Sequence, residues 1–213
     1  MPDVQSVLVA HDAEVRKWAT IAFFIMDPAT PAPTKESFWG ADHLPILPAA
    51  AKQLGYITTD GISDSIDISA EDTNMLQKLQ PVRNDLTGMT NTLSVSFGES
   101  NAYTQALRHA VPFEDFPETE VGAWHFDNEI SEFPEYRGGF IAQDGVGSQA
   151  VYRVEFGYRI KVVGMEGRTL NRTDAEVHGF TFGLFPDYVT GQPSYRGQDA
   201  PRYHAVTAPE QGA

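Results

Sequence analysis

The sequence predicts a mainly β protein, a β-sandwich or barrel with one α-helix and long loops. Three observations lead to this prediction. Several segments alternate apolar and polar residues with a period of two, one segment carries apolar residues at helical spacing, and long Pro-rich or polar stretches separate them. The chain has 213 residues, of which 41% are hydrophobic, so it can bury a core as a single domain.

The first two predicted strands lie in the N-terminal third of the chain. Residues 15–26 (VRKWATIAFFIM) are mostly apolar and indicate a largely buried strand. In residues 54–69 (LGYITTDGISDSIDIS), Ile62, Ile66 and Ile68 fall on one face of an extended chain, because successive strand side chains point to opposite faces. The other face carries Ser63, Ser65, Asp67 and Ser69.

Three further segments alternate in the same way. Residues 92–97 (TLSVSF) and 178–185 (HGFTFGLF) each set apolar side chains against hydroxyl or small ones. The longest run, 152–162 (YRVEFGYRIKV), has apolar residues at every even position and charged residues or glycine at the odd ones. We expect it to be one long strand with a single core face. That face would hold Tyr152, Val154, Phe156, Tyr158, Ile160 and Val162.

One segment predicts a helix. In residues 100–111 (SNAYTQALRHAV) the apolar residues recur at helical spacing. Ser100 or Asn101 can cap its start, and Pro112 ends it. We expect this helix to lie across an open end or face of the sheet.

Four stretches show no clear period and are predicted to be arms or loops. They are an N-terminal arm (1–14), a Pro-rich insert (27–49), a long inter-strand loop (70–91) and a C-terminal extension (190–213). Loops of this length in a compact domain are usually functional or covered by a partner. No internal repeat or second domain is evident.

Charge and cysteine content narrow the classes of function. The formal net charge is −14, which disfavours non-specific binding to nucleic acid and to anionic membranes. The chain has no cysteine, so disulfides and thiolate metal sites are excluded. No apolar run is long enough to cross a bilayer, and residues 1–18 lack the pattern of a secretion signal. We therefore expect no association with a membrane.

Motifs for catalysis are weak. Residues 144–150 (DGVGSQA) match part of a dinucleotide fingerprint, but a strand rather than a helix is predicted after them, which indicates a hairpin turn. No G-x-S-x-G motif is present. The acidic segment could contain a carboxylate pair for acid–base chemistry, although sequence alone cannot pair its members. Those acids are Asp60, Asp64, Asp67, Glu71 and Asp72.

Metal binding is also weakly indicated. His125, Asp127 and Glu129 share one side of an extended segment, a spacing that a strand-borne metal site could use. Many solvated acids surround them, and His109 and His178 fit ordinary packing or surface positions. We expect a protein that is not an enzyme, with no catalytic residue, metal or cofactor.

Four segments, in order, carry a resemblance to a known family. They are AFFIMDPATPAP, LGYITTDGISDSIDIS, NTLSVSFGESNAYTQALRHAV and YRVEFGYRIKVVGMEGRTLNRTDAEVHGFTFGLFPD. In this series the chain resembles the major tail tube proteins of long-tailed, non-contractile (siphovirus-type) bacteriophages. The resemblance covers roughly residues 15–188.

The resemblance implies a structural virion protein in the phage tail, made in the host bacterial cytoplasm. Such proteins form hexameric rings that stack into a tube, and strands of neighbouring subunits join into one barrel around the lumen. The implied partners are other copies of the chain and the tape measure, terminator and distal tail proteins. DNA passes through the tube during genome ejection without sequence-specific binding.

Two sets of residues follow as candidates. A wall that does not retain DNA should lack the Lys and Arg side chains that bind phosphates, so small hydroxyls and acids fit the lumen. The lumen-facing candidates are Ser63, Ser65, Asp67, Ser69, Thr92, Ser94 and Ser96. The subunit-contact candidates are Glu71, Asp72, Met75, Leu76, Leu79, Arg83, Arg153, Arg159 and Lys161.

Two alternatives from other classes stay open at the level of sequence. The first is a β-sandwich binding or virion-decorating module for a carbohydrate or protein ligand, with an aromatic platform built from residues 38–40 (FWG) and 123–126 (AWHF). The second is a metal-dependent barrel enzyme built around His125, Asp127 and Glu129.

Overall fold

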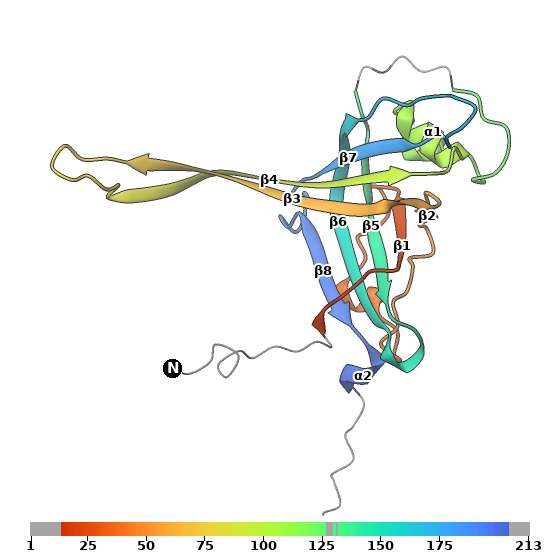
Figure 1. Cartoon of the computed structure of the whole chain (residues 1–213), viewed down its shortest axis with the longest axis horizontal. Helices are drawn as coiled ribbons and strands as arrows, with labels where there is room; N and C mark the ends of the chain where they lie inside the picture. Colours follow the sequence, from red (N-terminus) through yellow and green to blue (C-terminus); the bar gives the residue numbers. More distant parts are fainter. Residues whose placement is uncertain (1–13, 127–129, 131, 205–213) are drawn as a thin grey trace, which may run out of the picture.

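The computed structural model of the chain describes residues 14–126, 130 and 132–204. Within this part, eight strands form a single antiparallel sheet in the order β2-β1-β5-β6-β7-β4-β3, and β8 also pairs with β6. Figure 1 shows β3, β4 and β7 lying across the ends of β1, β5 and β6, so the sheet folds over on itself. The mainly β prediction is confirmed, but the sheet does not close into a barrel.

The strands and helices have the following bounds. The strands are β1 (Thr20–Met26), β2 (Lys52–Gln53), β3 (Ile57–Thr73), β4 (Arg83–Phe97), β5 (Glu135–Asp144), β6 (Val151–Met165), β7 (His178–Leu184) and β8 (Ser194–Asp199). The α-helices are α1 (Ala102–Arg108) and α2 (Pro201–His204), and the 3-10 turns are η3 (Lys35–Phe38), η4 (Phe113–Asp115) and η5 (Gly147–Gln149). Within the described residues, no helix has the length and apolarity that a membrane span requires.

β6 does not present a single core face, contrary to the prediction from its even positions. Its register with β5 shifts, so that Gly157 pairs with Gly138 but Ile160 pairs with Tyr136. Tyr158 and Arg159 of β6 therefore oppose Arg137 alone of β5, and such a bulge exchanges the faces of the residues beyond it. As a result Val154 and Phe156 lie in one apolar cluster, whereas Ile160 lies in the other.

Two apolar clusters, on opposite faces of the sheet, hold the fold together. The larger one lies inside the folded sheet and includes Phe23, Phe97 and Phe182, with the ring centroids of Phe23 and Phe182 5.1 Å apart. The smaller one lies on the opposite face of β1 and β6. There the 27–49 insert covers the sheet, since its Phe38 is fully buried and stacks on Tyr195 of β8.

Two adjacent glycines allow β5 to fit between β1 and β6. A Cβ on Gly138 would meet the carbonyl oxygen of Phe24, and one on Gly139 would meet the carbonyl oxygen of Glu155. Glycine in a strand interior commonly marks such a close approach of backbones. This pair sits beside the bulge in β6, where the two strands change register.

The predicted helix is present as α1, and of the two predicted caps, Ser100 and Asn101, the structure uses Asn101. Its side-chain carbonyl accepts a hydrogen bond from the backbone N–H of Thr104 at 2.9 Å. Its side-chain amide donates to the carbonyl oxygen of Leu54 at 3.1 Å, which ties the start of the helix to the segment before β3. α1 packs on the larger cluster through Ala106 and Leu107, both fully buried.

Two of the predicted loops contain regular structure. Residues 70–91 are not a long loop, because β3 continues to Thr73 and β4 begins at Arg83. Where Ser69 pairs with Gly88 and Ala70 with Leu86, β4 has one extra residue, Thr87, and this bulge breaks the period of two in β4. The C-terminal extension likewise contains β8 and α2, and the ladder to β6 orders β8 despite its polar sequence. The arm 1–14 lies outside the described residues, apart from Glu14.

Candidate subunit interface

The most distinctive surface of the molecule is the hairpin formed by β3 and β4. Figure 1 shows its distal part projecting well beyond the rest of the fold. β3 is a 17-residue strand at the end of the sheet order, so its outer edge has no partner strand among the described residues. A long unpaired edge is a template for pairing with another chain.

One face of the hairpin carries apolar side chains near the core and again farther out, with Asp64 and Asn91 between the two groups. Near the core, Leu93 and Val95 of β4 are buried in the larger cluster. Farther out, the same face carries four exposed apolar residues, because Ile68 pairs with Met89 and Leu86 pairs with Ala70. We call these four the apolar stripe: Ile66, Ile68, Leu86 and Met89, exposed by 47%, 65%, 67% and 58%.

The opposite face of the hairpin is polar. Ser63 pairs with Ser94, and Ser65 pairs with Thr92, so all seven lumen-facing candidates share this face of β3 and β4. We call the set Ser63, Ser65, Asp67, Ser69, Thr92, Ser94 and Ser96 the polar face. The face extends onto β7 through Thr181, whose hydroxyl lies 3.0 Å from that of Ser94. Across both strands of the hairpin, Arg83 is the only basic residue, and it lies at the far end.

The tip of the hairpin gathers six of the predicted contact residues. Met75, Leu76 and Leu79 belong to the short connector between β3 and β4, and the side chains of Leu76 and Leu79 are almost fully exposed. At the strand ends, the Asn84 amide donates to Asp72 at 2.6 Å, and Arg83 forms an ion pair with Asp85 at 2.7 Å. Glu71 stands opposite Asp85. Such fully exposed leucines contribute nothing to the stability of a single chain.

Arg196 of β8 anchors the base of the hairpin. Its guanidinium binds both carboxylate oxygens of Asp64 on β3, at 2.7 and 3.0 Å, and lies 3.4 Å from the Glu155 carboxylate on β6. Burial raises the pKa of Glu155, Arg196 opposes this shift, and Asp64 adds to it. Bidentate arginine–carboxylate pairs fix direction as well as distance, so this contact sets where the hairpin leaves the sheet.

The remaining predicted contact residues have partners within the chain. Arg159 lies 3.6 Å from Glu135, and Lys161 lies 2.6 Å from Glu132. Arg153 lies 3.9 Å from Glu155 and stacks over the ring of Trp18. These three basic residues thus each have an acidic neighbour within the chain, and their contact with a second copy stays a prediction.

The alternative sites are only partly assembled. Phe38 is buried in the smaller cluster and Trp39 donates to the Tyr195 hydroxyl at 2.9 Å, so residues 38–40 cannot form an exposed aromatic platform. Trp124 and Phe126 do stack on each other, with centroids 5.6 Å apart. In the metal hypothesis His125 is exposed, whereas Asp127 and Glu129 lie outside the described residues.

Sequence reasoning missed two parts of this surface. The sequence predicts a loop at Leu86 and Met89, since the bulge at Thr87 leaves these two residues of one face three positions apart. Arg196 falls in the predicted C-terminal extension, and SYRGQD, with Tyr195 as its one apolar residue, has no alternation that would indicate a strand. Its pairing with Asp64, 132 residues away, could not be inferred from a single sequence.

Comparisons with known proteins give little further information. No protein-family model and no curated protein matches the chain. One similar solved structure is a chain of the anti-feeding prophage (AFP) baseplate, from a 6-fold symmetrised cryo-EM structure. That match has a TM-score of 0.36 and 8% sequence identity, and it covers 83% of this chain and 90% of that chain. Similarity at this level does not establish a family.

Proposed function

We propose that the chain is a structural virion protein, the subunit of a phage tail tube, which assembles into hexameric rings that stack into a conduit for genome ejection. The observation that carries the proposal is the β3–β4 hairpin, with an exposed apolar stripe on one face and a polar face almost free of basic residues on the other. In this proposal the protein has an architectural role and no catalytic one.

The apolar stripe supports self-association. Burying a side chain such as Leu or Ile contributes about 1.5–3 kcal/mol to the free energy of association. Four such side chains lie close together in the apolar stripe, so burying them against a second copy would favour association. The unpaired outer edge of β3 lies alongside, so a neighbour could extend the ladder while covering the stripe. Head-to-tail contacts of this kind generate closed rings when the rotation between subunits closes.

The polar face supports a wall around DNA. Neutral hydroxyls and a carboxylate offer no cation for phosphate groups to bind, so a passing polyanion would release no counterions there. In the proposed ring this face lines the lumen and the apolar stripe is turned toward neighbouring subunits. DNA then passes without sequence-specific binding.

The position of the acids supports a non-catalytic role. Asp60 and Asp72 lie 12 positions apart on one strand, which corresponds to about 40 Å of extended chain. Asp64 is held by Arg196. The carboxylates of this segment are therefore spread along the hairpin rather than gathered into one site.

The partners in this proposal are first of all further copies of the chain. The tape measure protein would fill the lumen before ejection, and the terminator and distal tail proteins would bind the two ends of the tube. The site of action is the virion tail.

Electron microscopy of the purified full-length chain tests the proposal. We expect rings or tubes that form above a threshold protein concentration. A matched variant, in which Asn-Gly replaces residues 67–90, keeps the ladder between Ile62–Ile66 and Asn91–Val95 and should stay monomeric with an unchanged core. A full-length chain that remains monomeric at all concentrations, or a trimmed chain that still forms tubes, would contradict the proposal.

Ejection kinetics test the lumen assignment. Phage whose tubes carry Ser65→Arg and Ser94→Arg should assemble but eject DNA more slowly, because the new guanidinium groups bind phosphates. The control places the same two charges at Val146 and Ser148, exposed residues of the β5–β6 turn. Normal ejection from tubes with the hairpin changes would contradict the lumen assignment of the polar face.

A further inference from the structure

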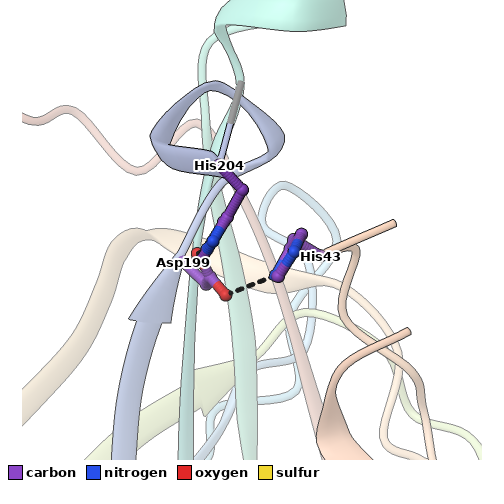
Figure 2. A group of neighbouring side chains, drawn as sticks. All are labelled: His43, Asp199 and His204. Carbon is purple, nitrogen blue, oxygen red and sulfur yellow. Dashed lines mark hydrogen bonds and ion pairs between the residues drawn. The ribbon is translucent and has the colours of Figure 1, made fainter. Parts of the chain in front are cut away.

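A cluster of three metal-ligating side chains lies far from the hairpin. Figure 2 shows the side chains of His43 and His204 next to each other, both reaching the carboxylate of Asp199. His43 Nδ1 lies 3.0 Å from one carboxylate oxygen of Asp199, and His204 Nε2 lies 2.6 Å from the other. The two imidazole rings are parallel, with centroids 3.4 Å apart, and the three donor atoms all lie within 4.8 Å of one another.

From this geometry we propose that His43, Asp199 and His204 form a binding site for a divalent transition-metal ion, with Zn²⁺ as the ion of choice. Two imidazole nitrogens and a carboxylate oxygen are the donors that Zn²⁺ takes in proteins, and three protein ligands leave a position for water. Mg²⁺ and Ca²⁺ prefer sets of oxygen donors, so the two imidazoles select against them. The site is independent of the proposed function.

The backbone holds His43 in a conformation that only a few residue types adopt. Its φ is +60°, in the left-handed region, and it sits in a tight turn in which the Gly40 N–H donates to the Leu44 carbonyl at 2.8 Å. The His43 N–H donates back to the Gly40 carbonyl at 2.9 Å. Residues held in this region cost conformational energy and cluster at ligand-binding positions.

The other two ligands are fixed by regular structure. Asp199 is the last residue of β8, where it pairs with Tyr152 of β6, and one of its carboxylate oxygens accepts the Ala200 N–H at 2.8 Å. His204 is the last residue of α2, one turn further along. Hydrogen bonds that orient a ligand in this way are typical of metal sites.

The site has room to open for an ion. In a tetrahedral Zn²⁺ site, donors about 2.0–2.1 Å from the metal are about 3.4 Å from each other, so the hydrogen-bonded donors must move apart by under about 1 Å. All three side chains are partly exposed, so the rings can separate toward solvent and water can reach the ion. A bound ion would join the 27–49 insert to β8 and α2 and so fasten the cover of the smaller cluster.

Titration of the full-length chain with ZnCl₂ alone tests the proposal. Calorimetry should give one Zn²⁺ per chain, MgCl₂ in its place should give no binding, and Co²⁺ should produce a visible absorption band from imidazole coordination. Zn²⁺ should also raise the melting temperature. Absence of Zn²⁺ binding to the wild-type chain would overturn the proposal, whatever the variants do.

Variants locate the site. His43→Asn, which tolerates the left-handed backbone, and His204→Gln should each weaken Zn²⁺ binding at least tenfold and remove the Co²⁺ band. His125→Asn changes an exposed histidine outside the cluster and should leave the Zn²⁺ affinity and the Co²⁺ absorption band unchanged. Circular dichroism confirms that each variant is folded. Equal Zn²⁺ binding by a folded His43→Asn, His204→Gln double variant would overturn the proposal.

Discussion

The two halves of β4 lie in different surroundings. From Asn91 to Phe97 the strand lies between β3 and β7, and every second residue is buried. From Arg83 to Thr90 it pairs with β3 alone, and none of its side chains is buried. Nevertheless, the face that is apolar in the inner half becomes apolar again beyond Asp64 and Asn91, as the apolar stripe.

The difference shows that alternation fixes which residues share a face but not what covers that face. In the inner half the cover is β1, β5 and α1, so the apolar residues stabilise the single chain. In the outer half nothing in the described chain covers them. Substitutions in the inner region should therefore change unfolding, and substitutions in the outer region should change association.

The largest effect is expected for Phe182→Ala. Phe182 is fully buried and stacks on Phe23 in the larger cluster, so the truncation leaves a cavity and should lower the free energy of unfolding by about 3–5 kcal/mol. Urea denaturation of the monomeric protein measures it. If Phe182→Ala lowered the free energy of unfolding no more than a substitution of an exposed hairpin residue does, the inner and outer regions would not differ as described.

The next effect is expected for Leu86→Ser in the apolar stripe. In the proposed assembly the change removes about 1.5–3 kcal/mol of burial from each contact between copies, so the threshold concentration for assembly should rise about 10- to 100-fold. The free energy of unfolding of the monomer should change by no more than about 0.5 kcal/mol. Light scattering follows assembly, and Ser69→Ala on the polar face is the control. An unchanged threshold would mean that subunits do not bury the stripe.

A smaller effect is expected for Asn101→Ala at the start of α1, near the inner end of β4. Loss of the cap to Thr104 and of the hydrogen bond to Leu54 should lower the free energy of unfolding by about 1 kcal/mol. Asn101→Asp keeps the oxygen that caps the helix, so it should lower the free energy of unfolding by less than Asn101→Ala does. Thermal unfolding compares the two, and equal losses would show that the cap itself is unimportant.

The smallest expected effect is a pH dependence of the free energy of unfolding, caused by a buried histidine in the inner region. His178 of β7 is fully buried beside Gln105, and burial lowers its pKa below the ordinary 6.5, as Arg108 and Arg168 also do, while Glu176 opposes them. A histidine with a lowered pKa stabilises the fold fully above the unfolded value and loses this contribution as the pH falls toward the folded value. The unfolding free energy should thus decline as the pH drops below about 6.5.

The test compares urea denaturation at about pH 7.5 and about pH 5.5. The decline of the wild type should exceed that of His178→Gln and equal that of His125→Gln, which changes an exposed histidine. If the wild type and His178→Gln declined equally, the buried imidazole would not be the source of the acid sensitivity.

Much of the fold could be predicted from local patterns. The alternation in residues 92–97 and 178–185 corresponds to β4 and β7, and the helical spacing after Asn101 corresponds to α1. These predictions succeeded because each segment is regular and its apolar residues lie at the expected spacing, in the larger cluster. The faces of the hairpin followed from the same alternation, and the register of β3 with β4 confirms them.

The rest depended on irregularities and on distant contacts. The bulge in β6 sends Phe156 and Ile160 to different clusters although both occupy even positions. The polar β8 is ordered by its ladder to β6, and no pattern in its own residues required that. His43 and His204 meet Asp199 because a left-handed turn and the end of β8 coincide in space, and a single sequence contains no signal for that.

The shared edge of β6 also sets an order of events during synthesis. β7 pairs with the second half of β6, whereas β8 pairs with the first half from Tyr152 to Gly157, on the same side. The ribosome makes β6 long before it makes β8, so the nascent chain carries an open stretch of backbone donors and acceptors until residue 199 has emerged. Cotranslational completion of the sheet therefore waits for one of the most polar strands in the molecule.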